Sequence, residues 1–288
     1  MNATCSIAGL NLVPVLAGGG TRLAVHVGVL AALEDLGVRY QRLVGVSGGS
    51  IVAALRAAGL APPRLLELVL DVDFARFRGR SLIELMRRGG LSSGAGFEQW
   101  LDTILEGRCF ADLDLDLAVV ATDVRSSRPV VFERSSTPGL KVSHAVRCSM
   151  GIPLLFSFQP WEGGLLVDGS ILSEDALHRD WTGNDTPVCL FRMRSASVPR
   201  PVPLNRWFPL GGYVTMLIRT FMTTISREFV DARHWPRTIV IDSGSCSLLE
   251  FRLDNAQKKE LYRRGYETTR SILPLKFEQS VAATHKGA

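Results

Sequence analysis

Apolar runs and helical repeats alternate along the N-terminal half of the chain, and further strand and helix patterns follow toward the C-terminus. Short apolar runs bounded by glycine or polar residues are typical of buried strands, whereas apolar residues recurring every three or four positions are typical of helices. The predicted strands are residues 12–17, 43–46, 117–122, 130–132, 165–167, 188–193 and 238–241. The predicted helices are residues 23–36, 51–58, 65–72, 142–149, 214–229 and 257–272. Strands alternating with helices predict a layered α/β domain with a mainly parallel sheet.

The length and composition indicate how this pattern is organised. The chain has 288 residues, of which 46% are hydrophobic and 21% charged, so it can bury a sizeable core. We expect a single domain over residues 1–274, with a mostly helical insertion at about 62–106 and a flexible tail at 275–288. A helix at about 207–229 carries an apolar stripe, which suits either a core helix or a cap over a pocket.

Several features bear on the location of the protein and its partners. No run of about eighteen apolar residues is present, and no basic segment precedes an apolar stretch near the start. The five cysteines include no Cys-x-x-Cys pair, which favours reduced thiols and argues against a structural zinc site. We therefore expect a cytoplasmic protein with no metal, no cofactor, no signal peptide and no transmembrane helix.

The charge pattern is compatible with an anionic surface. The net charge is +5, from 33 basic and 28 acidic residues. Residues 74–90 combine aromatic residues with five arginines against the single acid Glu84, a mixture that suits anionic lipid headgroups. A solvated helix face has the same composition, so both interpretations stay open. We expect a peripheral membrane contact and no nucleic-acid partner.

Two segments match Gly-x-Ser-x-Gly, and their surroundings distinguish them. A nucleophile elbow is a sharp turn between a buried strand and a helix, and the flanking glycines let the two elements approach closely. Ser47 follows a predicted strand and precedes a predicted helix, with Gly45 and Gly49 around it, whereas Ser92 follows a basic stretch. We interpret Ser47 as a nucleophile and Ser92 as a loop residue. The amide of Gly48 then lies at a helix N-terminus, which favours an oxyanion. The alternative is a glycine-rich turn without chemistry.

A nucleophilic serine needs a proton acceptor, and no histidine lies in an obvious catalytic segment. His26 belongs to an apolar helix and is expected to be packed there, and His234 is the remaining candidate for a late triad histidine. Asp168 follows an apolar strand and precedes Gly169, which predicts a carboxylate at the rim of the sheet. A simple Asp-Gly turn would look the same.

A third motif lies between the first strand and the first helix. Gly18, Gly19 and Gly20 are followed by Thr21 and Arg22. Consecutive glycines let backbone N–H groups point at one place, which suits an oxyanion or a phosphate. The segment lacks the Gly-Lys-Ser/Thr ending of a nucleotide-binding loop, and a flexible turn is the alternative.

In their order, the three motifs resemble those of the patatin-like phospholipase family. That family has a Gly-Gly-Gly-x-Arg-Gly loop, a Gly-x-Ser-x-Gly elbow and a distant Asp-Gly-Gly or Asp-Gly-Ala. The segments at 143–153 and 251–266 also resemble the family's sequence, so the likeness covers roughly residues 10–272. It implies a three-layer α/β/α sandwich and a serine lipid acyl hydrolase that cleaves phospholipids or lysophospholipids without a cofactor.

The resemblance also implies roles for individual residues. Ser47 matches the family's nucleophile and Asp168 its base, which together form a Ser–Asp dyad. The oxyanion-hole motifs fall on Gly18, Gly19, Gly20 and Gly48. The elbow and the Asp-Gly turn are supported by Gly45, Gly49 and Gly169. Arg22 matches the basic residue of the loop and is expected to position either an anion or the loop itself.

Departures from the family pattern keep other functions open. Leu23 and Ser170 replace small residues of the motifs, and residues 173–175 replace a common turn. One alternative is an acyltransferase or thioesterase that uses the same acyl-serine. Another is a lipid-binding module with little activity, dependent on a regulatory partner or an activating signal. The oligomeric state is left open.

Overall fold

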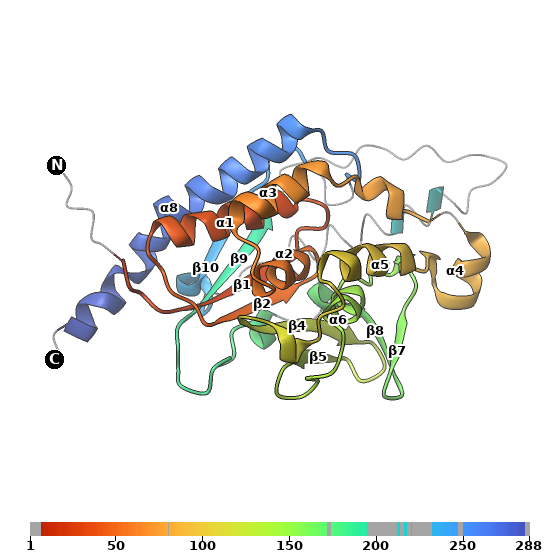
Figure 1. Ribbon diagram of the computed structural model, residues 1–288, viewed down its shortest axis with the longest axis horizontal. Coiled ribbons are helices and arrows are strands. Elements are labelled where there is room, and N and C mark those ends of the chain that lie inside the picture. Colours follow the sequence, from red (N-terminus) through yellow and green to blue (C-terminus); the bar gives the residue numbers. More distant parts are fainter. Residues whose placement is uncertain are drawn as a thin grey trace.

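A mainly parallel sheet forms the centre of the molecule (Figure 1). The computed structural model describes residues 7–79, 81–171, 174–194, 212–213, 216–217, 220, 232–246 and 250–285. The strands of the sheet are β1 (Val13–Ala17), β2 (Arg42–Val46), β4 (Asp116–Asp123), β5 (Arg128–Glu133), β7 (Gln159–Trp161), β8 (Gly164–Asp168), β9 (Val188–Arg194) and β10 (Thr238–Asp242). They lie in the order β10-β9-β1-β2-β4-β8-β7, and β5 also pairs with β4.

The strand directions decide where the functional segments meet. The strands from β10 to β4 are parallel to their neighbours, whereas β5 and β8 run antiparallel to β4, and β7 runs antiparallel to β8. Val46 at the end of β2 pairs with Val120 of β4, and the adjacent Ala121 pairs with Asp168 at the end of β8. The ends of β2 and β8 therefore lie on either side of the same part of β4.

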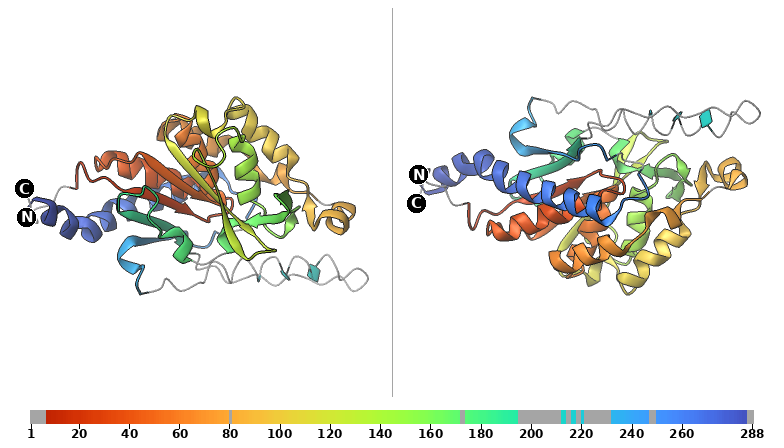
Figure 2. Two further views of the ribbon diagram at one scale, coloured as in Figure 1. Left: turned by 90° about the horizontal axis from the view of Figure 1, so that it is seen from below. Right: turned by 90° about the horizontal axis from the view of Figure 1, so that it is seen from above.

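Helices cover one face of this sheet (Figures 1 and 2). They are α1 (Leu23–Asp35), α2 (Gly48–Ala57), α3 (Pro62–Asp71), α5 (Ala95–Ile104), α6 (Val142–Ser149) and α8 (Asn255–His285). On the other face, Val44, Val120 and Leu190 pack with Leu177 and Trp181. The predicted α/β class with a mainly parallel central sheet is confirmed. Apolar runs predicted the strands because most of these strands are buried on both faces.

Shorter elements complete the described part of the chain. Helix α4 (Leu82–Arg88) precedes a two-stranded sheet made of β3 (Gly90–Ser92) and β6 (Leu154–Phe156). The short 3-10 helices are η1 (Phe74–Phe77), η2 (Phe110–Asp112), η3 (Gly169–Ile171), η4 (Glu174–Leu177) and η5 (Trp235–Arg237). Within the described ranges, no helix combines the length and the apolar character needed to span a bilayer.

The structure differs from the sequence prediction in two places. The predicted insertion at 62–106 is mostly helical but contains strand β3, so Ser92 lies on a strand and not in a loop. Helix α8 continues through Pro274 to His285, so residues 275–285 of the expected tail are helical, while the flexibility of the tail stays a prediction. The helix continues because Leu273 and Phe277, on either side of the proline, are both buried. The predicted cap helix at 207–229 lies outside the described residues except for 212–213, 216–217 and 220.

Candidate active site

Ser47 occupies a sharp turn between β2 and α2. Its backbone has φ 52° and ψ −131°, a left-handed conformation that is uncommon for a residue other than glycine. A Cβ atom on Gly45 would lie 2.5 Å from the Cα of Ser50, and one on Gly49 would overlap the carbonyl oxygen of Leu16. The two glycines around the serine are therefore required by the close approach of the helix to the strands.

The hydroxyl of Ser47 meets the carboxylate of Asp168. The Ser47 Oγ donates to Asp168 Oδ2 at 2.6 Å, and the backbone N–H of Ser170 donates to Asp168 Oδ1 at 2.8 Å. Both partners are buried, with exposed fractions of 1% for Ser47 and 0% for Asp168. Burial raises the pKa of Asp168, and the hydrogen bonds from Ser47 and Ser170 oppose part of that rise. The structure thus joins two residues that are far apart in the sequence.

Neighbouring residues hold the backbone of the elbow. The N–H of Ser47 donates to the Oγ of Ser149 at 2.9 Å, and that hydroxyl donates to the carbonyl of Val120 at 2.6 Å. The Ser50 Oγ donates to the carbonyl of Ser47 at 2.6 Å. Ser149 therefore links the elbow to β4. The segment 143–153 contributes to the family resemblance, but no local pattern marks Ser149 within it, because its partners are backbone groups of distant segments.

The glycine loop packs against the start of α2. Gly18, Gly19 and Gly20 all have positive φ angles, of 69°, 110° and 55°. The N–H of Gly18 donates to the carbonyl of Val46 at 3.1 Å, and the carbonyl of Gly18 accepts from the N–H of Gly49 at 3.0 Å. Any Cβ on Gly48 would overlap the carbonyl oxygen of Gly20. The loop and the elbow are thus in direct contact.

These bonds determine which amides of the loop are free to bind a ligand. The N–H groups of Gly18 and Gly49 are already occupied. The N–H groups of Gly19, Gly20 and Gly48 have no acceptor among the described residues. Of the four glycines expected in the oxyanion hole, three can therefore offer an N–H to an anion, while Gly18 shapes the turn.

A buried histidine contacts the glycine loop formed by residues 18–20. His26 of α1 is fully buried, and its Nε2 lies 3.1 Å from the carbonyl oxygen of Gly18. Burial, opposed by the hydrogen bond to Gly18 and aided by the nearby Arg22, lowers the pKa of His26 to about 4, so the ring is neutral at pH 7. A neutral ring bonded to a carbonyl oxygen carries its proton on that nitrogen, so His26 donates to Gly18. The expectation of a packed helix residue was incomplete, since the ring also holds the loop.

Arg22 ties the loop to the segment that follows β10. Its guanidinium is buried, and it donates to the carbonyl of Gly19 at 3.2 Å, to Ser243 Oγ and to the carbonyl of Cys246 at 3.4 Å. Burial lowers the pKa of Arg22 to about 10, which leaves it charged at pH 7. Of the two roles expected for Arg22, the geometry supports positioning of the loop.

A narrow apolar pocket lies beside Gly20. Its remaining walls are Thr21, Phe74, Phe77, Phe97, Met150, Ile152, Phe156 and Phe251. Its volume of about 20 Å³ holds about one water molecule, so a longer ligand needs these side chains to move. The sequence left open whether the stretch 74–90 meets a membrane or is a solvated helix face. In the structure Phe74 is buried and Phe77 is partly buried against the core, with their rings edge to face at 6.0 Å.

The remaining residues named in the sequence analysis either support the Ser47–Asp168 site or lie away from it. Gly169 packs against β4, where a Cβ would overlap the carbonyl of Val120. Ser92 Oγ donates to the carbonyl of Phe77 at 3.1 Å. His234 stacks on His178 at 4.1 Å near the amino end of β10, whereas Ser47 follows the carboxyl end of β2. In the described ranges, no three potential metal ligands come together.

Comparisons with known proteins agree with the motifs. A family model described as "Patatin-like phospholipase" matches residues 15–178, which is more than half of the chain. The uncharacterized protein YqhO of Bacillus subtilis is 25% identical over 286 residues, covering 90% of this chain and 97% of that protein. The mouse patatin-like phospholipase domain-containing protein 6 is 28% identical over 186 residues, covering 58% of this chain and 12% of that much longer protein.

A solved structure gives the same result for the fold. VipD from Legionella pneumophila superposes with a TM-score of 0.68 at 14% identity, over 92% of this chain and 67% of VipD. Identity that low bears on the fold alone, while the family model bears on the sequence. The chain therefore belongs to the patatin-like phospholipase family.

Proposed function

We propose that this protein is a serine lipid acyl hydrolase that cleaves carboxylic esters of phospholipids or lysophospholipids. The observation that carries the proposal is the buried 2.6 Å hydrogen bond from Ser47 to Asp168 beside three unoccupied glycine amides. Membership in the patatin-like phospholipase family supports the same chemistry. The nucleophile, the base and the anion site are then all within one small region.

The first half of the reaction forms an acyl-enzyme. Asp168 accepts the proton of the Ser47 hydroxyl as the Oγ attacks the carbonyl carbon of the ester. The carbonyl oxygen becomes negative and binds the N–H groups of Gly19, Gly20 and Gly48, each contributing roughly 3 kcal/mol to stabilising the transition state. The carbon–oxygen bond to the glycerol oxygen then breaks, and that oxygen takes the proton from Asp168.

The second half releases the fatty acid. A water molecule attacks the acyl carbon and gives its proton to Asp168, while the same amides bind the oxyanion again. The bond to the Ser47 Oγ breaks, and the serine recovers the proton from Asp168. The products are a fatty acid and the deacylated lipid.

The surroundings of Asp168 suit a base in this scheme. Because burial raises its pKa, the carboxylate binds a proton more strongly than an exposed aspartate does. The N–H of Ser170 holds one of its oxygens and leaves the other for Ser47. Activity should fall as the pH is lowered through the raised pKa, because protonated Asp168 cannot accept the serine proton.

The substrate class follows from the pocket beside the anion site. Its lining is almost entirely apolar and includes five phenylalanines, which suits an acyl chain whose carbonyl lies over Gly20. We propose that the protein works at the surface of a membrane from the cytoplasmic side, where such chains are available.

The proposal is tested by labelling and by product analysis. Ser47→Ala should lose labelling by a fluorophosphonate and release of fatty acid from phospholipid vesicles, and Asp168→Asn should lose at least about a hundredfold in rate. Ser92→Ala is the matched control, because that serine lies in the second Gly-x-Ser-x-Gly segment and should leave both readouts unchanged.

Three results would contradict the assignment. Labelling that persists in Ser47→Ala would place the nucleophile elsewhere. Transfer of the acyl group to an added alcohol in preference to water would indicate an acyltransferase. Wild-type protein that binds lipid but never reacts with the fluorophosphonate would indicate a lipid-binding module.

A further inference from the structure

Helix α4 lies at one end of the molecule (Figures 1 and 2). Two of its apolar side chains are exposed to solvent. Met86 is 80% exposed, the most exposed large apolar side chain among the described residues, and Ile83 is 62% exposed. They are three positions apart on the helix and therefore lie on the same face. A solvated helix on a soluble surface would carry polar residues at these two positions.

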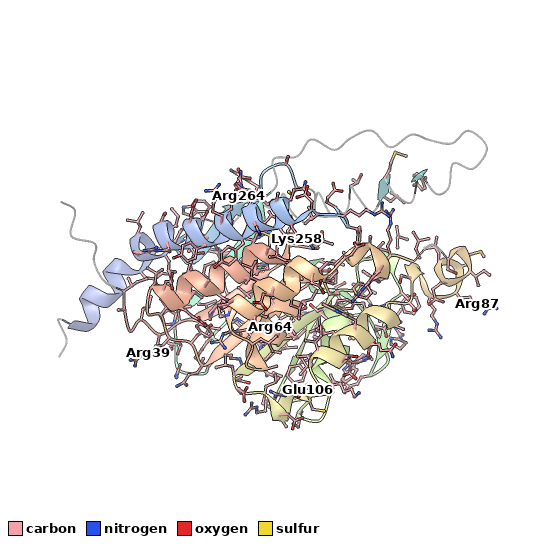
Figure 3. The ribbon with its side chains drawn as sticks, turned by 45° about the horizontal axis from the view of Figure 1, so that its top comes forward. Arg39, Arg64, Arg87, Glu106, Lys258 and Arg264 are labelled. Atoms are coloured by element: carbon pink, nitrogen blue, oxygen red, sulfur yellow. The ribbon has the colours of Figure 1, made fainter. Side chains whose placement is uncertain are left out.

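Exposed arginines surround this apolar face. Arg87 and Arg88 follow Met86 in the last turn, and Arg87 points away from the body of the protein (Figure 3). Arg76 and Arg78 are exposed in the segment just before the helix. The single acid of α4, Glu84, is partly buried, accepts a hydrogen bond from Ser157 and lies 4.0 Å from Arg88. It offsets part of the positive charge, but two arginines against one acid leave the helix net positive.

The opposite face of α4 contacts the apolar pocket. Leu85 packs against a small cluster formed by Ile152, Leu155 and Phe156. Two members of that cluster, Ile152 and Phe156, also line the pocket beside Gly20. Leu85 of α4 therefore packs on side chains that also line the pocket in which we place the acyl chain.

We propose that α4 is a membrane-docking element that recognises an anionic lipid bilayer. Ile83 and Met86 enter the boundary between headgroups and acyl chains, while Arg87 and Arg88 contact the phosphates of the headgroups. Apolar side chains next to arginines match the chemistry of an anionic bilayer surface. The apolar side chains alone, or the arginines alone, would bind that surface weakly. The link to an acyl chain rests on the proposed hydrolase function, but docking itself does not require turnover.

Docking is tested with Ser47→Ala protein, so that hydrolysis cannot alter the vesicles. Co-sedimentation is measured with vesicles of phosphatidylcholine alone and of phosphatidylcholine with phosphatidylglycerol. Adding Arg87→Gln and Arg88→Gln should weaken binding to anionic vesicles about fivefold for each arginine and reduce its salt dependence. Adding Ile83→Ser and Met86→Ser should weaken binding at least about tenfold, with the salt dependence retained.

Matched controls separate a local effect from a general one. Leu275→Ser removes an apolar side chain that is 67% exposed on α8, and Arg39→Gln with Arg64→Gln removes two exposed charges far from α4 (Figure 3). Both controls should bind vesicles like the parent protein. All of these positions are exposed, so circular dichroism should show the parent fold in every variant.

The outcomes distinguish this inference from the proposed function. Equal binding of the parent protein to neutral and anionic vesicles would overturn the docking proposal. Equal binding of the parent protein and the α4 variants to anionic vesicles would also overturn it, and this result is the one expected if α4 docks a protein. When the α4 substitutions are made in protein that keeps Ser47, the variants should cleave a soluble ester at the wild-type rate. Failure of that ester assay in all proteins would refute the hydrolase, while the vesicle assay would still decide the docking surface.

Discussion

Replacing His26 by glutamine should make the protein less sensitive to acid. His26 is fully buried, with its Nε2 3.1 Å from the carbonyl of Gly18. Burial, together with the positive charge of Arg22, lowers its pKa from 6.5 to about 4. Glutamine keeps an N–H donor within reach of the same carbonyl but does not titrate, so the substitution removes the proton equilibrium and retains the hydrogen bond.

The expected magnitude follows from this change in pKa. Between about pH 6.5 and pH 4, the unfolded chain protonates this histidine and the folded protein does not. The free energy of unfolding therefore rises with pH in that interval and falls as acid is added. At about 1.4 kcal/mol per pKa unit, the contribution lost across the interval is on the order of 3 kcal/mol. That is a large share of the stability of a typical domain.

Urea unfolding followed by circular dichroism at pH 7 and pH 4.5 measures the effect. The wild-type protein should lose roughly 2 kcal/mol more between the two pH values than His26→Gln does. Because every other titrating group, Asp168 included, is common to both proteins, their contributions cancel in the difference. If both proteins lose the same free energy of unfolding, His26 is not held neutral in the folded protein and the reasoning fails.

Three further substitutions probe the packing and charge of the site. Asp168→Asn should raise the melting temperature at neutral pH, because it replaces a buried carboxylate. It should also remove the loss of stability that occurs as the pH rises from 3.8 to the raised pKa of Asp168. Thermal scans that show an unchanged or lower melting temperature would contradict this. Ser149→Ala should lower the free energy of unfolding by about 2–4 kcal/mol, because it leaves a buried N–H and a buried carbonyl without partners, and a urea titration that shows a negligible change would refute it. Gly49→Ala should severely destabilise the protein or prevent folding, because the new methyl group overlaps the carbonyl of Leu16, whereas Gly96→Ala, where a Cβ meets no atom within 4 Å, should fold and melt like wild type.

Much of the fold could be predicted because its determinants are local. The central strands are buried apolar runs, and the elbow is marked by Gly45 and Gly49, which the close approach of strand and helix requires. Such signals lie within a few residues of the feature they predict. The three-residue strands β3, β6 and β7 leave too short a pattern to detect.

The contacts between distant segments could not be derived in the same way. A carboxylate at the end of an apolar strand was predicted from the sequence, but the direction of that strand and its neighbours in the sheet were not. In the structure β8 runs antiparallel to β4, and Asp168 reaches Ser47 because it pairs with Ala121, next to the partner of Val46. Direction and register are properties of the assembled sheet, so only the family resemblance brought the two residues together beforehand.

Polar residues inside apolar helices were the least predictable. His26 and Ser149 are polar side chains on buried helix faces, and periodicity shows only that such faces are packed. Their functions depend on which backbone groups they meet, namely the carbonyl of Gly18 and the N–H of Ser47. The mixed stretch at 74–90 contains both environments, because Phe74 is buried while Ile83 and Met86 are exposed, and its composition alone does not separate them.

Hydrogen bonds that hold the elbow and the glycine loop in place determine which backbone N–H groups of the site can still bind a substrate oxygen. The N–H groups of Ser47, Gly18 and Gly49 are all consumed in holding the elbow and the loop together. The amides without an acceptor among the described residues belong to glycines with positive φ or to a helix start, and Arg22 and His26 hold the loop that carries them. In the proposed mechanism these amides meet the developing negative charge without reorganising, which is the condition under which such donors lower a barrier most. Substitutions beneath the loop should therefore reduce the rate of acylation more than they weaken substrate binding.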